Sequence, residues 1–562
     1  MSYPDLFNPD LLDRIPLDAG VMVDVGCASG ALGAEYKRRN PAARVLGIER
    51  DPAAARIAEQ RLDAVKIADL DADPLPFADA LPPGSVDCLV YGDVLEHLAD
   101  PWAVLRAHVP LLSERGIVVI CMPNAEHWSF AERLLRGTFS YEPLGLFDQT
   151  HLRWFTAETT RRTLRAVGLT PIDVIPRIFD KPAAAAFCDA AEPGLRRLGI
   201  DVAAYRERCQ PLQHVWRARR RPTRTLPLVS TMLNPVGGVS HLRVVEPMAA
   251  LATDPSLATR VIDTADDFTA DPDKPGIFIF HRPLLAGDSG IARVREIAAR
   301  GWLVLCEFDD HPDYIPVLQR PDIQNFRAVH AVQTSTEPLA EVLRRDNPEI
   351  KVFPNGIARM PDVANFRDPA RLTMLFAGIN REKEWQPYLD ALNAVVRKAG
   401  ERLQVVVVND RALFEQLATP HKRFVPLCGY DTYQALLGAS EISFAPLTDT
   451  PFNRCKSDLK FIEAAAHRVT ALASRVVYEG SIRDGETGVL FGTGEELEQR
   501  LLRLVANPEI ARGIGDAARA YVARERMLAY QLAERVAWYH ALWARRPELH
   551  AALLRRVPEF VS

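Results

Sequence analysis

The chain has 562 residues, of which 48% are hydrophobic and 25% charged, and this composition is ordinary for a globular protein. About 150 residues per domain is typical, so the length predicts several domains. The formal net charge of −5 excludes a general basic field, and we expect no nucleic-acid partner.

The cysteines and the apolar runs restrict the location of the protein. The 8 cysteines are scattered without C-x-x-C spacing, which argues against a disulfide scaffold and against a zinc site. This usage is typical of a reducing compartment, so the sequence predicts a cytoplasmic protein. The N-terminus lacks a basic stretch followed by an apolar one, and no apolar run is long enough to span a bilayer.

A glycine turn after a short apolar run organises the first part of the chain. Residues 21–25 are predicted to form a buried strand, Gly26 and Gly30 the turn that leaves it, and residues 31–39 a helix. Ligands of open α/β sheets bind at such turns, where glycine lets a ligand approach the backbone. The dinucleotide pattern G-x-G-x-x-G is absent. From the residues alone, any Rossmann-like turn remains an alternative.

The spacing of Asp24, Gly26 and Gly30 resembles the first motif of class I S-adenosylmethionine (SAM)-dependent methyltransferases, with Ala28 in place of the middle glycine. The run D-V-L-E-H-L that begins at Asp93 resembles the small-molecule branch of this family, which includes quinone and sugar methylases. The resemblance implies a Rossmann-like methyltransferase domain over residues 1–221, with SAM as its cofactor.

Further cofactor residues follow from the same resemblance. Residues 43–49 are predicted to form a second strand, and its terminal Glu49 would accept both ribose hydroxyls; an ordinary carboxylate at a strand end is the alternative. Asp69 would lie near the adenine amino group and Leu70 would line the ring. Asp93, at the end of the predicted strand 86–93, completes the cofactor set.

Two histidines are candidates for work on the methyl acceptor. His97 titrates near neutrality and could accept a proton from an acceptor hydroxyl; alternatively, it orders the loop at a helix start. His151 lies in the aromatic and polar segment 147–156, whose lack of regular period suits a lid over an acceptor. It could contact the acceptor or hold the lid. Thr156 is the predicted N-cap of the next helix.

Two antiparallel strands, at 169–179 and 213–219, are expected to close this domain, and a basic run at 219–224 follows. This run is interpreted as a solvated connector, with contact to phosphates or an anionic membrane as the alternative.

The second part of the chain alternates strands and helices twice. Strands are predicted at 226–233, 258–262, 276–281, 302–308 and 329–335, and residues 234–243 form a glycine loop leading into a helix. After a Pro-Asn-Gly sequence at 354–356, strands return at 372–378, 403–409, 424–427, 442–446 and 469–473. Two such halves, 226–357 and 358–528, resemble a GT-B glycosyltransferase. The fold class is therefore α/β throughout, with a Rossmann-like methyltransferase followed by two Rossmann-like half-domains.

Residues 453–466 resemble the donor-binding helix of family 4 and related retaining glycosyltransferases. An anion is favoured at a helix start and near cations. By this resemblance Lys456, Ser457 and Lys460 would hold the diphosphate of a nucleotide-sugar, and Glu463 its ribose. The family's second glutamate is here Cys455, a departure that puts the usual sugar contact in doubt. An amphipathic surface helix is the alternative.

Further candidates for the second activity lie outside this helix. Arg381 and Lys383 would add phosphate contacts, although the family's usual arginine position is Gly378. Asp309 and Asp310, at a strand end, could orient an acceptor hydroxyl; a loop turn that uses its own aspartates is equally compatible. GT-B enzymes rarely need a divalent ion, so we expect no metal.

The C-terminal segment is predicted to contain a long amphipathic helix over 524–542, with residues 529–562 crossing back onto the first half of the GT-B module. Trp538 and Trp543 resting on a bilayer surface is the alternative.

These patterns together predict a bifunctional enzyme. One module would transfer methyl from SAM to a hydroxyl of a sugar or glycan, and the other a sugar from a nucleotide-sugar with retention, in surface-polysaccharide (O-antigen or capsule) biosynthesis. The expected partner is a glycan or lipid-linked oligosaccharide acceptor, and peripheral association with the inner membrane face and homo-oligomerisation stay open. The alternative is an active methyltransferase with a non-catalytic, glycan-binding GT-B module. A nucleic-acid methylase is disfavoured by the negative charge.

Overall fold

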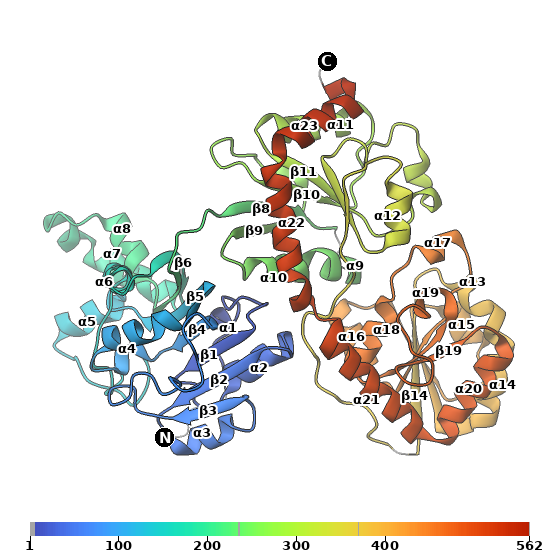
Figure 1. The fold of residues 1–562 in the computed structure, drawn as a ribbon, viewed down its shortest axis with the longest axis horizontal. Coiled ribbons are helices and arrows are strands. Elements are labelled where there is room, and N and C mark those ends of the chain that lie inside the picture. The colour runs from blue at the N-terminus through green and yellow to red at the C-terminus, as the bar shows by residue number, and fades with distance from the viewer. Residues whose placement is uncertain (1–5, 234–236, 369, 561–562) are drawn as a thin grey trace. The chain divides into compact units, whose positions relative to one another are not determined.

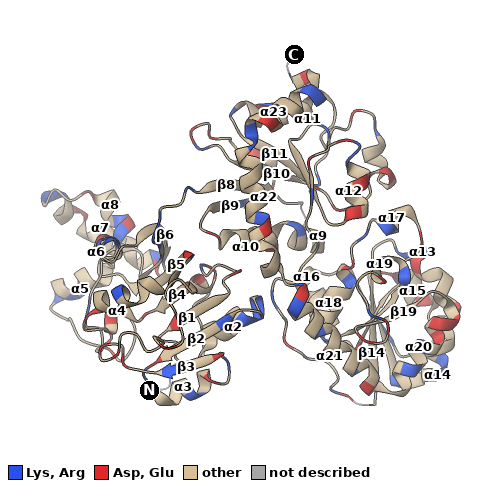
Figure 2. Ribbon diagram, viewed as in Figure 1, with Lys and Arg blue, Asp and Glu red and all other residues tan. Residues whose placement is uncertain are grey.

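The computed structural model describes residues 6–233, 237–368 and 370–560, so residues 234–236 of the predicted glycine loop lie outside the described residues. The chain divides into two compact units. The first comprises residues 1–37, 41–225 and 252–256, and the second residues 38–40, 226–251 and 257–562. Segments rich in Lys and Arg are interspersed with acidic segments in both units (Figure 2).

The first unit is built on a seven-stranded sheet with the order β3-β2-β1-β4-β5-β7-β6 (Figure 1). The first five strands are parallel, and β7 runs antiparallel to both of its neighbours. The strands are β1 Val21–Val25, β2 Arg44–Glu49, β3 Ala64–Ile67, β4 Val86–Gly92, β5 Leu112–Pro123, β6 Thr170–Arg177 and β7 Gln213–Arg219. The helices are α1 Pro9–Leu12, α2 Ala31–Arg39, α3 Pro52–Ala58, α4 Pro101–His108, α5 Trp128–Arg136, α6 Ala157–Ala166, α7 Lys181–Arg197 and α8 Val202–Cys209.

The side chains of β1 pack on both faces of this sheet, so both faces are buried. Met22 packs in one core cluster, whereas Val23 and Val25 pack in another. Successive side chains of a strand point to opposite faces, so a nearly continuous apolar run is what a covered parallel strand requires. Thr156 caps α6 as predicted, accepting a hydrogen bond from the Thr159 N–H at 3.1 Å.

The second unit contains two six-stranded parallel sheets. The first has the order β13-β12-β11-β10-β8-β9, and the second β16-β15-β14-β17-β18-β19. The second order is that of the doubly wound dinucleotide fold, and the first is a flavodoxin-like order with one strand added. The α/β fold class predicted from the sequence, one Rossmann-like domain followed by two Rossmann-like half-domains, is confirmed.

The elements of the second unit alternate as expected. Its strands are β8 Leu226–Thr231, β9 Leu257–Ile262, β10 Ile277–His281, β11 Leu303–Glu307, β12 Ala331–Thr334, β13 Ile350–Val352, β14 Leu372–Ala377, β15 Leu403–Val408, β16 Lys422–Val425, β17 Ile442–Ala445, β18 Thr470–Ser474 and β19 Val489–Phe491. Its helices are α9 Gly238–Ser240, α10 Glu246–Ala252, α11 Gly287–Ala299, α12 Glu337–Leu343, α13 Glu382–Trp385, α14 Leu389–Ala399, α15 Arg411–Gln416, α16 Tyr430–Gly438, α17 Pro451–Arg454, α18 Leu459–Ala466, α19 Arg475–Tyr478, α20 Gly494–Ala506, α21 Pro508–Glu525, α22 Leu532–Ala544 and α23 Arg546–Arg556.

The single helix predicted over 524–542 is wrong. The chain leaves helical geometry between α21 and α22, where the Ile357 N–H donates to the Arg526 carbonyl and the Leu528 N–H to the Ile357 carbonyl. These backbone groups pair with a distant segment, which a helical period cannot reveal. Within α22, the Tyr539 hydroxyl donates to Gln333 at 2.8 Å, so this helix contacts β12. No helix in the described part of the chain has both the length and the apolar character that a bilayer crossing needs.

Candidate functional site

The turn after β1 has the backbone geometry that its glycines predict. Gly26 and Gly30 have φ values of 72° and 75°, and Ala28 also lies in the left-handed region at 46°. A Cβ on Gly26 would approach Val94 Cγ2 to 2.4 Å, so no other residue fits there without a rearrangement. The turn therefore brings bare backbone to the carboxyl end of the sheet.

A cavity of about 560 Å³ opens at this end of the first unit. This volume lies within the range of pockets that hold drug-sized ligands, roughly 300–1,000 Å³. All of the sequence-predicted cofactor residues except Gly30 line it, and so do both histidines: Asp24, Gly26, Glu49, Asp69, Leu70, Asp93, His97 and His151. Gly30 is the last residue before α2, and its N–H donates to the Cys27 carbonyl at 2.8 Å.

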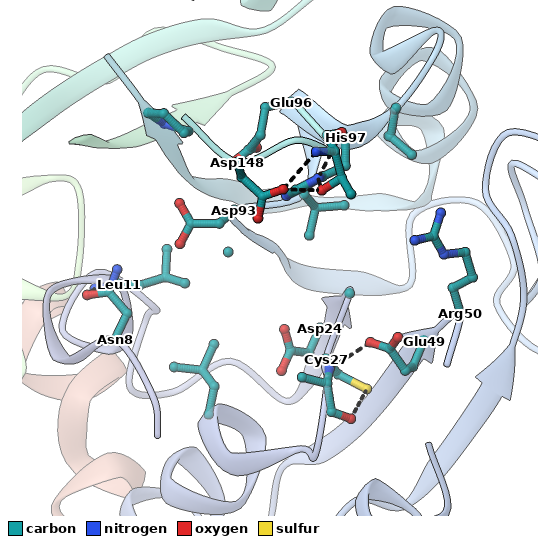
Figure 3. Close-up of a pocket in the computed structure, with 18 of the residues that line it drawn as sticks. Asn8, Leu11, Asp24, Cys27, Glu49, Arg50, Asp93, Glu96, His97 and Asp148 are labelled. Atoms are coloured by element: carbon teal, nitrogen blue, oxygen red, sulfur yellow. Dashed lines mark hydrogen bonds between the residues drawn. The ribbon is translucent and has the colours of Figure 1, made fainter. Parts of the chain in front are cut away.

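Carboxylates follow the ends of consecutive strands of the sheet. Glu49, at the end of β2, accepts the Ala28 N–H through Oε2 and the Asp51 N–H through Oε1, each at 2.8 Å. A carboxylate offers about four acceptor positions, so both oxygens can still accept hydroxyls. Asp24, the next-to-last residue of β1, lies beside it (Figure 3). It is 3% exposed, and its Oδ2 lacks a hydrogen-bond partner. Burial, and then the charge of Glu49, raise the pKa of Asp24 to about 7.

His97 belongs to a hydrogen-bonded chain that fixes its tautomer. The Thr150 hydroxyl has one proton and donates it to Asp148 Oδ1 at 2.6 Å. It must therefore accept from His97 Nδ1, 2.9 Å away, which leaves Nε2 of the neutral ring as an acceptor. Burial lowers the pKa of His97, which favours this neutral form. The lid segment that carries Thr150 thus orients the histidine.

His151 packs edge-on against His97, with ring centroids 4.7 Å apart, and its Nδ1 lies 3.2 Å from the Leu146 carbonyl. One ligand atom each of Glu96, His97 and His151 lie within 4.8 Å of one another, the only such donor group among the described residues. Both carboxylate oxygens of Glu96 lack a partner. By donor type this group could hold a divalent cation, although no metal is expected from the sequence.

Several lining residues were not predicted from the sequence. Asn8 and Leu11 come from the N-terminal segment, Phe179 follows β6, and Gln213 begins β7. Each is distant in sequence from the motifs. A strand start after a helical stretch is a visible signal for Gln213, but its proximity to Asp93 depends on the sheet order.

In the second unit, two predicted phosphate residues lie at one small cavity. Arg381 and Lys460 line a space of about 60 Å³ together with Ser443, Tyr433 and Tyr478. This volume holds a handful of waters and is much smaller than a typical ligand pocket. Lys383, on α13, is exposed and is not among the described residues that line it.

The predicted ribose residue, Glu463, is buried and already has three partners. Its Oε1 accepts from the Tyr430 hydroxyl at 3.1 Å and from Gln434 Nε2 at 2.9 Å, and its Oε2 accepts from the Tyr433 hydroxyl at 3.0 Å. Lys460 Nζ in turn donates to the Tyr433 hydroxyl at 2.9 Å. In this conformation the side chains of α16 cover the carboxylate.

The remaining candidates of the second unit pair with one another. Asp309 and Asp310 each accept from Arg282, at 3.0 and 2.7 Å, and Asp310 also accepts from Lys456. Burial raises the pKa of Asp309. It acts the same way on Asp310, but the charges and hydrogen bonds of Lys456 and Arg282 together outweigh it and lower the pKa of Asp310. Ser457 accepts from Asn355 Nδ2 at 2.9 Å. Lys456 thus contacts a carboxylate rather than facing the cavity beside Lys460.

Comparison with known proteins bears chiefly on the first unit. A family model described as "Methyltransferase domain" matches residues 23–118. A ubiquinone biosynthesis O-methyltransferase of Cereibacter sphaeroides is 27% identical over 180 residues, which is 31% of this chain and 70% of that protein. A trans-aconitate 2-methyltransferase of Azoarcus sp. is 35% identical over 130 residues, which is 23% of this chain and 49% of that protein.

Among solved structures, HepE of Anabaena in complex with UDP and glucose matches 56% of this chain and 99% of that one, at 10% identity and a TM-score of 0.41. A score this low establishes no fold, so the architecture of the second unit rests on its own strand order. For the first unit the motif, the cavity and the family model agree. Residues 23–118 match a methyltransferase domain, so the first unit carries a methyltransferase module with SAM as its cofactor.

Proposed function

We propose that the first unit transfers the methyl group of SAM to a hydroxyl of a sugar or glycan. The observation that carries this proposal is the single cavity in which the glycine turn, Glu49, Asp93 and the lid histidines meet. Adenosine would lie over the ends of β3 and β2, with its ribose on Glu49, and the methionine part beyond the turn. The methyl group would then face His97.

The methyl transfer is an in-line displacement. The acceptor oxygen attacks the methyl carbon, the carbon–sulfur bond breaks with its electrons going to sulfur, and the hydroxyl proton passes to His97 Nε2. The protein contributes mainly alignment and the exclusion of water. An aromatic cluster of Phe130, Phe139, Phe147 and Trp154 holds the lid, with ring centroids 4.7 to 6.0 Å apart.

Removal of the proposed base tests this chemistry. His97→Gln should lower the rate of methyl transfer to a sugar acceptor by about 10²- to 10⁴-fold, while S-adenosylhomocysteine (SAH) still binds. His214→Gln, on β7 and outside the cavity lining, is the matched control. An unchanged rate in His97→Gln would reject the base. Loss of wild-type activity on chelation, restored by Mg²⁺ or Mn²⁺, would assign His97 to a cation instead.

We further propose that the second unit transfers a sugar from a nucleotide-sugar, with retention. Its two doubly wound sheets and the cations Arg381 and Lys460 at one cavity support this proposal. Cations placed there would stabilise the diphosphate as it leaves. Nucleotide-sugar hydrolysis should be slower in Glu463→Ala than in the wild type, and equal rates would count against a working donor site.

Two transferases on one chain suggest successive steps on one acceptor. The proposed acceptor is a glycan or lipid-linked oligosaccharide of a surface polysaccharide such as O-antigen or capsule, reached in the cytoplasm at the inner membrane face. A labelled acceptor that receives both the sugar and the methyl group from one preparation would support this order of events. An acceptor that is glycosylated but never methylated would argue against it.

A further inference from the structure

A chain of hydrogen bonds leads from the N-terminal helix of the first unit to Asp93. Asp10, on α1, accepts from Arg177 Nε at 2.7 Å. Arg177, at the end of β6, donates through Nη1 to Gln213 Oε1, and Gln213 Nε2 donates to Asp93 Oδ1 at 2.6 Å. Segments that are far apart in sequence, α1, β6 and β7, are thus linked in series to one carboxylate.

The charge of Arg177 fixes the orientation of the Gln213 amide. A guanidinium group has only donors, so it must face the amide oxygen. The amide nitrogen is therefore directed at Asp93. Burial raises the pKa of this carboxyl group to about 6, and the hydrogen bond from Gln213 acts in the opposite direction by favouring the ionised form. Arg177 itself is held by Asp10, and its side chain is 15% exposed. If the amide rotated by half a turn, its NH2 group would face the donors of Arg177 and its oxygen would face the acceptor oxygen of Asp93. Neither pair can form a hydrogen bond.

Asp93 occupies a special place in the sheet. It follows β4 directly and has a φ of 56°, a left-handed conformation that few non-glycine residues adopt and that is often found at functional sites. The strand order places Glu49, the last residue of β2, on one side of β1 and Asp93, directly after β4, on the other. Neighbouring strands lie about 4.8 Å apart, so the two carboxylates stand roughly 10 Å apart across the cavity. A cofactor with its ribose on Glu49 would bring its amino-acid part to Asp93.

We propose that Gln213 is a positioning residue for cofactor binding. It holds Asp93 so that this carboxylate pairs with the α-ammonium group of SAM, and Arg177, anchored by Asp10, holds Gln213 in turn. This inference rests on the assignment of the cavity to SAM. It adds two residues, on β6 and β7, that no sequence motif indicates.

Gln213→Glu is the sharpest test, because it keeps the acceptor for Arg177 and replaces only the donor to Asp93. SAH should bind about tenfold more weakly at pH 8, the loss expected for one charge-assisted hydrogen bond. 5′-Methylthioadenosine, which lacks the amino-acid part, should bind within twofold of wild type. Gln210→Glu, the same charge change three residues earlier and outside the cavity lining, should leave both affinities within twofold.

A purely structural role predicts a different pattern. If Gln213→Glu weakens both ligands equally, or neither, the positioning role is rejected. Asp10→Asn provides a second, milder variant, because the Asp10 side chain is 49% exposed. It should weaken SAH about two- to fivefold and leave 5′-methylthioadenosine unchanged, and equal effects on both ligands would again reject the proposal. Absence of SAH binding in the wild type would instead reject the SAM site itself.

Discussion

At the scale of single residues, Glu49 carries the most direct prediction for the methyltransferase. Replacing it with Gln keeps its size but turns one acceptor oxygen into a donor. Hydrogen bonds to a charged group contribute about 1.5 to 3 kcal/mol each, so SAH should bind roughly 10- to 100-fold more weakly. Equilibrium titration measures this. Asp51→Asn, at the N-cap of α3 beside it, is the control, and equal effects of the two changes would contradict the ribose assignment.

The raised pKa of Asp24 predicts that the free energy of unfolding depends on pH. Its pKa of about 7 in the folded protein exceeds the value near 3.9 of an unfolded carboxyl group. Between these values the folded state holds more protons than the unfolded state. The free energy of unfolding contributed by Asp24 therefore falls as the pH rises from about 4 to about 7, and stays low above that. Asp24→Asn removes this loss.

Thermal unfolding of ligand-free protein checks the Asp24 prediction. The Tm of Asp24→Asn should exceed that of the wild type by more at pH 8 than at pH 5, because the wild type carries the unfavourable buried charge only at the higher pH. The difference amounts to a few kcal/mol at most. A gain that is the same at both pH values would show that Asp24 does not titrate in this range.

Only some residues of the first cavity could be predicted from the sequence. Asp24, Gly26 and Glu49 lie at or next to the ends of strands that the sequence predicts. Because the carboxyl ends of parallel strands lie at the same end of the sheet, these residues reach the cavity without further information on the fold. Gln213 reaches Asp93 only because β7 inserts between β5 and β6. That order is set by packing over the whole sheet, and a one-dimensional pattern does not contain it.

At the scale of elements, α16 decides the state of the donor pocket. Its first five residues supply the hydroxyls and the amide that cover Glu463, and its Tyr433 hydroxyl also accepts from the Lys460 ammonium. The motif of α18 could be recognised from its sequence, but the occupancy of Glu463 could not, because α16 lies some 30 residues earlier. The ribose can reach this carboxylate only if the α16 side chains withdraw.

Tyr433→Phe tests this competition. The change removes the hydroxyl but keeps the ring, which frees one oxygen of Glu463 and the Lys460 ammonium. UDP or another nucleoside diphosphate should bind about fivefold more tightly, as expected when one protein hydrogen bond no longer has to be broken. Tyr388→Phe, on the same half but away from the pocket, should have no effect. Weaker binding by Tyr433→Phe would show that the hydroxyl is itself a ligand contact.

At the scale of the whole molecule, we propose one nucleotide site in each unit. The first has a cavity of about 560 Å³ ready for a cofactor, and the second only about 60 Å³ at its phosphate cations. The first unit should therefore bind its ligand without rearrangement, whereas the second must open. We expect faster association for SAH than for a nucleoside diphosphate, measurable by stopped-flow fluorescence, and equal rates would argue against a covered donor site.

A thermal-shift titration with SAH, with a panel of nucleoside diphosphates and with both together tests the central claim most directly. A ligand at 100 times its Kd adds about 2.7 kcal/mol to the stability of the state that binds it. We predict that SAH and one diphosphate each raise the Tm, that Glu49→Gln reduces only the first shift, and that Glu463→Ala reduces only the second. No shift with SAH, or loss of both shifts in either variant, would contradict two separate sites.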